Sequence, residues 1–298
     1  MTEDETVWTI SRSTGTAAGL HQRAEPEPVT HQVWIHTVTG PALVLGSTQD
    51  DSVVDHGSAA RYGVEVCRRR TGGGLVDLVP GRHCWIDVII PTTSPWWEAD
   101  VGRAFHWLGE VWAATVADLV GPDPTVTVHR GGPVGRDAGR VVCFAGLGAG
   151  EVTVTAAPPS SPPPRPTDPP RPTDPLHPGG AVKVVGLSQR RWRTGARFQG
   201  ALLWDWTPEP LAAHVRSTAL ATAGIELDRL AVGLPPDPGR GPLDPGSVAA
   251  RFLHHLPGRP PPVRGPVRAD SPTERTPDPP VAGSGTANEP GVAGGERS

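Results

Sequence analysis

The distribution of proline limits how this chain of 298 residues can fold more than any other feature. Eleven prolines lie between residues 156 and 180, where the hexapeptide Pro-Pro-Arg-Pro-Thr-Asp occurs twice in tandem, at 163–168 and 169–174. Frequent proline favours an extended, solvated backbone that buries no core. We therefore expect a Pro-rich loop over 156–180, which is either an inert loop expansion or a ligand for a proline-binding partner.

The two ends of the chain also lack a globular pattern. Residues 257–298 are rich in Pro, Gly, Ser and Thr and contain few large apolar side chains, which predicts a disordered tail. Residues 1–30 are polar without clear periodicity, which predicts a flexible N-terminal arm. The folded part is therefore expected over 31–256, interrupted by the Pro-rich loop.

Short apolar runs alternate with helical patterns within the expected domain. Apolar residues from Val101 to Leu119 recur at helical spacing after Asp100 and stop at Gly121, and further helices are expected at 211–220 and 248–256. This mixture predicts an α/β (α+β) fold with a mixed sheet flanked by helices. The expected strands are 42–46, 84–90, 125–129, 141–144, 151–155, 182–187 and 198–204.

Composition excludes several classes of protein. The net charge of −4 gives no electrostatic basis for nucleic-acid binding, and no apolar run reaches the roughly 18 residues of a membrane span. The acidic first residues lack the apolar stretch of a secretory signal. The three cysteines form no CxxC motif, which argues against disulfides or a zinc cluster and for a reducing compartment, so we expect a cytoplasmic protein.

A glycine-rich segment is the first candidate binding element. Arg68, Arg69, Arg70 and Thr71 precede three consecutive glycines, Gly72–Gly74. Successive glycines let a ligand approach the backbone, whose N–H groups can bind an anion, and neighbouring arginines can hold a phosphate or carboxylate. The alternative is a flexible turn beside a solvated basic run.

Lys183 is the only lysine in the chain, and every other basic side chain apart from histidine is arginine. It lies in an expected strand, where alternation places Lys183 and Val185 on one face and requires an anionic partner for the ammonium. The alternative is an edge-strand lysine that opposes aggregation. Asp87, inside another apolar strand, needs a partner of the opposite sign. Three arginines follow Lys183 closely, at Arg190, Arg191 and Arg193.

Together these motifs resemble the catalytic domain of the biotin/lipoate protein ligase family, in the branch of lipoate–protein ligase A and the octanoyltransferases. The resemblance covers about residues 40–256. It rests on the following segments: Gly46-Ser47-Thr48-Gln49, Arg69-Arg70-Thr71-Gly72-Gly73-Gly74, Lys183-Val184-Val185-Gly186-Leu187-Ser188-Gln189-Arg190-Arg191 and Phe198-Gln199-Gly200-Ala201-Leu202-Leu203.

This resemblance implies a twisted sheet with a tunnel for lipoate or octanoate beside the Gly72–Gly74 loop. Lys183 would match the family's catalytic lysine and stabilise negative charge on the acyl carbonyl or on the phosphate of an acyl-adenylate. The substrate- or adenylate-binding residues that it implies are Gln49, Arg69, Arg70, Thr71, Gly72, Gly73, Gly74, Gly186 and Ser188.

The sequence departs from the ligase pattern at four places. Ser47 replaces an arginine, Leu78-Val79 replace a His-Asp pair, and the Pro-rich loop precedes the lysine motif. The residues after 256 are too polar to form an accessory domain. This last difference weakens the case for a self-sufficient ATP-dependent ligase, although an accessory protein could replace the missing domain.

Cys143 raises an alternative to the ligase. It lies where the transferase relatives carry a nucleophilic cysteine that forms an acyl thioester without ATP, and Lys183 near it would favour the thiolate. The alternative for Cys143 is a plain core residue, as we expect for Cys67 and Cys84.

Three hypotheses follow: the expected function is a ligase that attaches a lipoyl or octanoyl group through acyl-AMP, and the other two are its alternatives. A ligase would use ATP and Mg²⁺, form acyl-AMP and require Lys183. A cysteine acyltransferase would need no cofactor and would require Cys143. A non-catalytic acyl-binding scaffold would show no turnover. For the two enzymes the expected acceptor is a lysine of a lipoyl-carrier domain, such as glycine cleavage H protein or the E2 of a 2-oxoacid dehydrogenase, and no membrane or nucleic-acid partner is expected.

Overall fold

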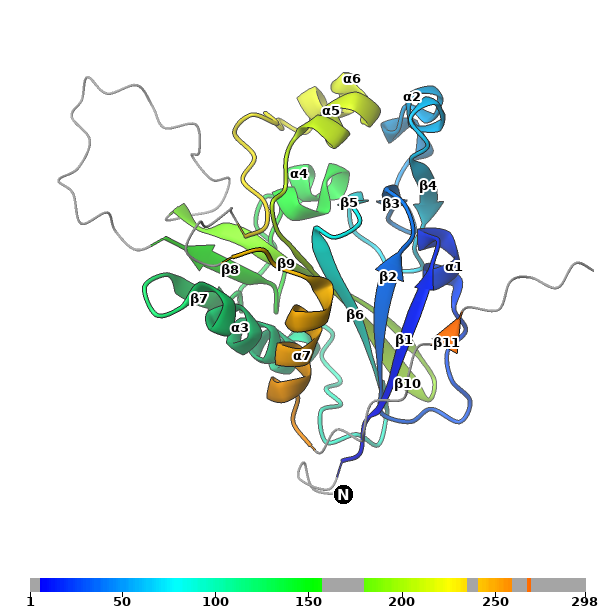
Figure 1. Ribbon diagram of the computed structural model, residues 1–298, viewed down its shortest axis with the longest axis vertical. Coiled ribbons are helices and arrows are strands. Elements are labelled where there is room, and N and C mark those ends of the chain that lie inside the picture. The colour runs from blue at the N-terminus through cyan, green and yellow to red at the C-terminus, as the bar shows by residue number, and fades with distance from the viewer. Residues whose placement is uncertain (1–5, 157–179, 235–240, 259–266, 269–298) are drawn as a thin grey trace, which may run out of the picture.

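The computed structural model describes residues 6–156, 180–234, 241–258 and 267–268 (Figure 1). In these residues a large mixed sheet of eight strands has the order β11-β1-β2-β6-β10-β9-β8-β7. β1 pairs in parallel with β2 and with β11, and all the other neighbours are antiparallel. The strands span β1 Thr9–Gly15, β2 Gln32–Val38, β6 His83–Pro91, β7 Thr125–Val128, β8 Val152–Thr155, β9 Val182–Trp192, β10 Gly195–Leu203 and β11 Val267–Arg268.

A second, three-stranded sheet has the order β4-β3-β5, with β3 Ala42–Leu45, β4 Glu65–Arg68 and β5 Val76–Leu78. Its strand β3 is fully buried, which agrees with its uninterrupted apolar sequence. In Figure 1 this small sheet lies next to α1. The first two backbone N–H groups of α1 donate hydrogen bonds to the Glu65 carboxylate of β4.

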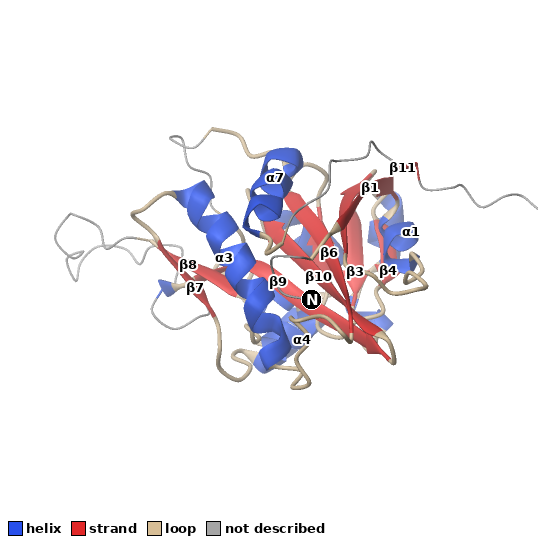
Figure 2. Ribbon diagram, turned by 90° about the horizontal axis from the view of Figure 1, so that it is seen from below, coloured by secondary structure: helices blue, strands red, loops and turns tan. Residues whose placement is uncertain are grey.

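The helices are mostly short. Figure 2 shows α3 and α7 running across one face of the large sheet. None of the helices in the described ranges is long and apolar enough to cross a membrane. The helices span α1 Ala17–Gln22, α2 His56–Arg61, α3 His106–Val120, α4 Arg136–Val141, α5 Glu209–His214, α6 Ser217–Thr222 and α7 Pro245–His255, with 3₁₀ turns η2 Asp51–Val53, η3 Arg103–Phe105 and η4 Cys143–Ala145.

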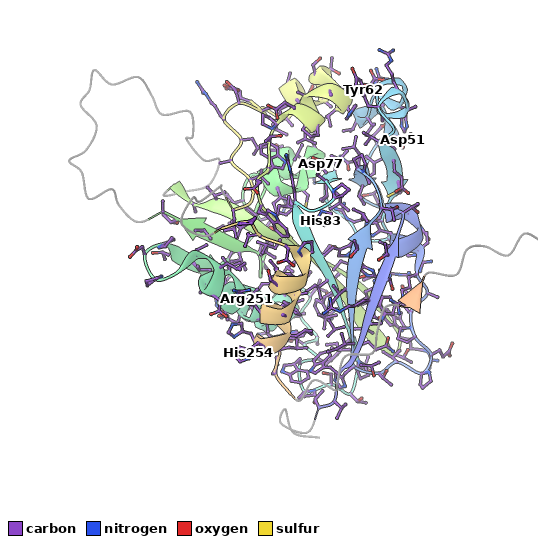
Figure 3. All side chains as sticks on the ribbon, viewed as in Figure 1. Asp51, Tyr62, Asp77, His83, Arg251 and His254 are labelled. Carbon is purple, nitrogen blue, oxygen red and sulfur yellow. The ribbon has the colours of Figure 1, made fainter. Side chains whose placement is uncertain are left out.

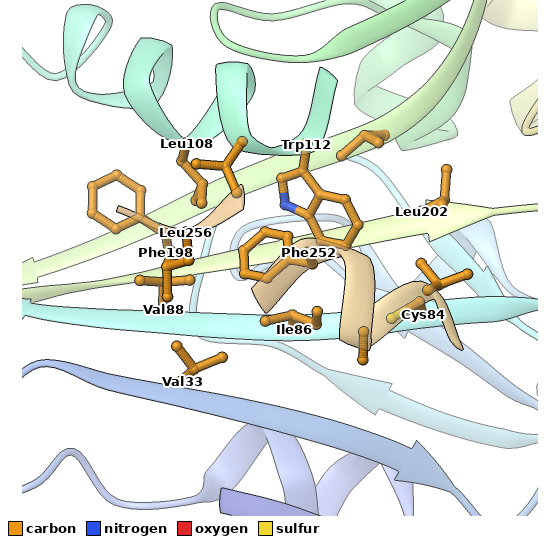
Figure 4. Close-up of a cluster of buried hydrophobic side chains, with 14 of the residues drawn as sticks. Val33, Cys84, Ile86, Val88, Leu108, Trp112, Phe198, Leu202, Phe252 and Leu256 are labelled. Carbon is orange, nitrogen blue, oxygen red and sulfur yellow. The ribbon is translucent and has the colours of Figure 1, made fainter. Parts of the chain in front are cut away.

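The main core lies between these two helices and the sheet. Trp112 of α3 and Phe252 of α7 are both fully buried, with ring centroids 4.6 Å apart, and they pack on strand residues such as Ile86 and Leu202 (Figure 4). Alternation along β6 directs Ile86 to this core and Trp85 to a smaller core shared with α1 and the small sheet. The large sheet is therefore buried on both faces.

One irregularity in β9 matters for the site. Val152 of β8 pairs with Val185, and the next residue, Thr153, pairs with Lys183. Between these two pairs β9 therefore has one extra residue, Val184. Such a β-bulge reverses the alternation of the strand beyond it. Lys183 and Gly186 consequently both face Phe144, whereas the sequence alternation predicts Lys183 and Val185 on one face. That prediction is wrong, and Val185 lies in the main core.

Several other expectations need correction. The predicted N-terminal arm is wrong from Thr9 onward, because β1 and α1 are part of the fold and Trp8 is fully buried. Residues 141–144 form the end of α4 and the turn η4, not a strand. The helix predicted over 211–220 is two helices, because Val215 is extended between them. Most of the Pro-rich loop and of the tail lies outside the described residues.

Candidate active site

An apolar cavity lies between strands β9 and β10, the small sheet and α1. Its volume is about 50 Å³, smaller than the roughly 150 Å³ of an engineered apolar cavity that binds benzene. Binding of an acyl chain therefore requires some lining side chains to move. The lining residues are His21, Val44, Arg69, Val76, Leu78, Trp85, Cys143, Phe144, Gly186, Leu187, Ser188, Gln199, Gly200 and Ala201.

The Gly72–Gly74 loop forms part of the site because its backbone packs against two other segments. A Cβ on Gly46 would collide with the Gly73 carbonyl, and a Cβ on Gly74 would lie 2.5 Å from the Gly139 carbonyl oxygen. Gly73 adopts φ +100°, which favours glycine. The glycines thus allow the loop to lie against α4, and Leu75 then accepts the backbone N–H of Cys143 at 2.8 Å.

Arg69 holds this loop from inside. Its side chain donates to the Thr71 hydroxyl at 3.1 Å, and one terminal nitrogen donates to the carbonyls of both Gly72 and Gly74 at 2.8 Å. A third carbonyl, that of Val44, accepts from the other terminal nitrogen. Arg69 is 5% exposed and lines the cavity. Arg69, which the resemblance assigns to substrate binding, therefore holds the glycine loop in its conformation.

A polar network connects the loop to β9 and β10. The Thr71 hydroxyl lies 3.0 Å from the Ser188 hydroxyl and 3.2 Å from the Gln199 amide oxygen. The Gln199 amide nitrogen lies 3.3 Å from Nδ1 of His21, and burial lowers the pKa of His21 to about 3. His21 is therefore neutral. The polar side chains of this network hydrogen-bond one another along one wall of the cavity.

Lys183 is 1% exposed, and its ammonium has three acceptors. Nζ lies 2.7 Å from Oε2 of Glu151 and donates to the carbonyls of Cys143 and Gly146, each at 2.9 Å. The sequence-based expectation of an anionic partner is met by Glu151. An ammonium has three N–H groups, so each of them is used inside the protein in this conformation.

Glu151 is a site residue that the sequence reasoning missed. It also accepts the backbone N–H groups of Gly148 at 2.6 Å and Leu187 at 3.1 Å, and it is 5% exposed. It thus joins the segment that carries Cys143 to the strand that carries Lys183. No spacing in the sequence indicates this role, because Glu151 reaches Lys183 through the β8–β9 pairing.

Cys143 lies where two hollows meet. It lines the apolar cavity and also a second, more open pocket beside it, which includes Lys183, Glu151, Gly72 and Gly73. The second pocket carries two arginines of α4, Arg136 and Arg140. The predicted catalytic pair, Lys183 and Cys143, is therefore brought together with the glycine loop.

Comparison with known proteins gives matches in structure only, because no family model and no curated protein sequence matches the chain. A bipartite lipoate protein ligase of Thermoplasma acidophilum, solved in work on that ligase and its E2 lipoyl domain, matches with TM-score 0.54 and 12% identity over 89% of this chain and 87% of that one. A lipoate–protein ligase A bound with ATP matches with TM-score 0.52 and 12% identity over 84% of this chain and 83% of that one. The fold is that of the lipoate–protein ligases.

Within this lipoate-ligase fold, four residues that the resemblance assigns to the site line neither the cavity nor the open pocket: Gln49, Arg70, Thr71 and Gly74. Thr71 and Gly74 still contact Arg69 in the glycine loop, whereas Arg70 and Gln49 have other partners. Arg70 is exposed and pairs with Glu25 at 3.1 Å. Gln49 bonds the Gly46 N–H and the Val141 carbonyl, and so supports the loop from outside.

The arginines after Lys183 also lie away from the cavity. Arg190 pairs with the same Glu25 at 2.8 Å, and Arg191 donates to the backbone carbonyls of Glu98 and Ala99. Asp87 has its partners elsewhere in the fold, where Arg197 and His36 contact it. Burial alone would raise the pKa of Asp87, but these two neighbours outweigh it and hold that pKa below its usual range.

Proposed function

We propose that this protein transfers a medium-chain acyl group, octanoyl or lipoyl, from a thioester donor to a lysine of a lipoyl-carrier domain through a thioester on Cys143. The observation that carries the proposal is the position of Cys143 between an apolar cavity and an open pocket. The apolar lining of the cavity suits an acyl chain once some lining side chains have moved, and the pocket gives donor and acceptor access to the sulfur. The lipoate-ligase fold supports this substrate class.

Each step of this reaction balances. The Cys143 thiolate attacks the acyl carbonyl of the donor, the donor's C–S bond breaks, and the donor leaves as a thiol after it takes up a proton. The neutral amine of the acceptor lysine then attacks the Cys143 thioester, forms the amide and loses a proton, while the Cys143 sulfur leaves. No ATP is consumed.

The chain's own residues would assist both steps. Lys183 anchors the carbonyls of Cys143 and Gly146 and so fixes the segment that carries the sulfur. The glycine loop lies beside Cys143 and leaves room for the carbonyl, because a Cβ on Gly73 would lie 4.0 Å from Sγ of Cys143. Fixed groups around the reacting centre lower the cost of orienting it.

A ligase is the second candidate, and the arginines of the open pocket favour it. Arg136 and Arg140 lie beside Gly72 and Gly73 and would hold the phosphates of ATP, with Mg²⁺ held largely by those phosphates. ATP would supply the adenylate leaving group that activates a free carboxylic acid. In that reaction Lys183 would be required and Cys143 would be dispensable.

Intact-mass measurement of an apo lipoyl-carrier domain separates the two candidates. The full chain is incubated with the acceptor and either octanoyl-carrier protein without ATP or octanoate with Mg-ATP. We expect a gain of one octanoyl group from the acyl-carrier protein alone, with acylated enzyme modified at Cys143. Cys143→Ser should abolish this gain.

Cys67→Ser is the matched control, because Cys67 lines neither hollow and burial raises its pKa to about 12. It should keep full transfer. A gain that needs ATP and survives Cys143→Ser would overturn the transferase in favour of the ligase. No gain under either condition would contradict both enzymes and leave a non-catalytic acyl-binding protein.

A further inference from the structure

Among the described residues, one lysine and two arginines are buried: Lys183, Arg69 and Arg197. Two of these three side chains have a carboxylate partner. Lys183 pairs with Glu151, and Arg197 pairs with Asp87. Arg69 differs, because no carboxylate of the described residues lies within 4.0 Å of its guanidinium nitrogens. Its bonded partners are three backbone carbonyls and one hydroxyl, all neutral.

An unpaired buried charge is costly, so its presence at a cavity points to an anion that uses it. Arg69 remains charged at neutral pH, because guanidinium has a very high intrinsic pKa. Burial lowers the pKa of Arg69, and Cys143 is first among the neighbouring ionisable groups that counteract this. Cys67 and Glu151 act in the same direction, but Glu151 pairs with Lys183 and lies more than 4.0 Å from the Arg69 guanidinium nitrogens.

The glycine loop brings Arg69 and Cys143 close to one position, that of Gly73. A Cβ on Gly73 would lie 2.9 Å from Nη2 of Arg69 and 4.0 Å from Sγ of Cys143. The guanidinium and the sulfur therefore both border the space that the missing side chain of Gly73 leaves open. Both residues also line the apolar cavity.

We infer that Arg69, and not Lys183, supplies the positive charge that acts on the Cys143 sulfur. The charge of Lys183 is compensated by Glu151 at 2.7 Å, whereas the charge of Arg69 is not compensated by any carboxylate within ion-pair distance in the described part of the chain. Arg69 thus lies where its charge can attract the negative charge that the Cys143 sulfur carries when it attacks and when it leaves. This inference rests on the proposed function only in taking Cys143 as the nucleophile.

Two alkylating reagents of different charge test the inference without any acyl donor. Iodoacetamide is neutral and iodoacetate is an anion, and each loses iodide when the Cys143 sulfur attacks its methylene carbon. The ratio of the two rates, iodoacetate over iodoacetamide, reports the local charge. A change that only distorts the site alters both rates and leaves the ratio unchanged. Peptide mass spectrometry follows Cys143 separately from Cys67 and Cys84.

We expect the ratio at pH 7 in the full-length protein to be about tenfold above that of an unfolded peptide around Cys143, as expected for an uncompensated charge a few ångströms away. Arg69→Gln should return the ratio close to the peptide value, and Arg69→Lys should keep most of it. Arg70→Gln is the matched control, because it removes the same charge from the next residue, which pairs with Glu25 outside the cavity.

Two results would overturn the inference. One is a peptide-like ratio in the unmodified protein, which needs no variant and so does not depend on whether Arg69→Gln folds. The other is a raised ratio that does not fall in Arg69→Gln; a fall in Lys183→Met would then assign the charge to Lys183, and no fall in either variant would assign it to Arg136 and Arg140 of the open pocket. Acyl transfer with a peptide-like ratio would support the proposed function and contradict this inference. A raised ratio that depends on Arg69, without acyl transfer, would support this inference and contradict the proposed function.

Discussion

At the scale of single residues, Asp77 is the side chain whose environment opposes its charge most directly. It lies on β5 (Figure 3). The Asp77 side chain is 8% exposed, and its Oδ2 is buried with no hydrogen-bond partner in the described residues. Burial raises the pKa of Asp77 from 3.8 to about 7, although Arg82 partly opposes this. The neutral acid is therefore the form that the fold prefers.

The raised pKa predicts that ionisation of Asp77 destabilises the fold as pH rises. The unfolded chain releases this proton above a pH of about 3.8 and the folded chain only above about 7, so stability is lost between these values and stays lost above them. Asp77→Asn should unfold like the unmodified protein near pH 4 and be more stable by about 2–4 kcal/mol at pH 8. Urea unfolding at the two pH values measures this.

Asp137→Asn serves as the control, because the Asp137 side chain is 87% exposed. It should change stability little at either pH. An effect of Asp77→Asn that is equal at pH 4 and pH 8 would contradict the prediction, since only ionisation distinguishes the two conditions.

At the scale of elements, the Lys183–Glu151 pair ties the segment before β8 to β9. Because both partners are buried, we expect Lys183→Met or Glu151→Gln alone to lower the free energy of unfolding by about 3–5 kcal/mol through the charge left unpaired. The double variant should lose clearly less than the sum of the two. Denaturant unfolding of all four proteins gives the coupling energy.

The exposed pair Arg103–Glu98, at 3.3 Å, provides the comparison. Its coupling energy should not exceed about 1 kcal/mol. If the Lys183–Glu151 cycle gave a coupling energy in that same range, the pair would not act as the tie that we describe.

The elements also show where sequence patterns succeed and where they fail. Apolar runs identified β3 and β6, and helical spacing identified α3, since each buries a continuous face. β1 was missed because its polar residues hide a half-buried strand. The prediction that Lys183 and Val185 share one face of β9 was wrong, because a single bulge residue reverses the alternation of the strand. Alternation is the only basis on which a sequence predicts such a face.

The site was predictable only where residues adjacent in sequence act together. The glycine loop and the β9 motif carry their own patterns, and the structure places Ser188, Lys183 and Cys143 at the lining of the two hollows, with Thr71 hydrogen-bonded to Ser188. The partner of Lys183 was not predictable, because Glu151 meets it through pairing between strands. The different charge environments of Arg69 and Arg70 depend on burial, which neighbouring arginines in a sequence do not reveal.

At the scale of the whole molecule, residues 157–179 lie in the connection between the paired strands β8 and β9. Val154 pairs with Val182, so the two strands meet at the point where those residues are inserted. Replacing 157–179 with a short Gly-Ser linker should change the free energy of unfolding by less than about 1 kcal/mol, because loop-closure entropy varies slowly with length. Thermal or urea unfolding and the alkylation rate of Cys143 would show this.

The same linker inserted into β9 after Val184 is the control and should abolish folding, because it breaks the pairing with β8 and β10. Loss of folding in the replacement variant as well would show that residues 157–179 make contacts that the fold requires.

The first and last parts of the described fold meet. The Trp8 indole, fully buried, donates to the Pro257 carbonyl at 2.7 Å, and a Cβ on Gly258 would lie 2.6 Å from the Thr6 carbonyl. During synthesis on the ribosome the N-terminal strand emerges long before α7, so it must wait with Trp8 uncovered until the end of α7 leaves the exit tunnel. The N-terminal part of the fold is therefore completed only after α7 has been synthesised, and the strands made first need protection from aggregation until then.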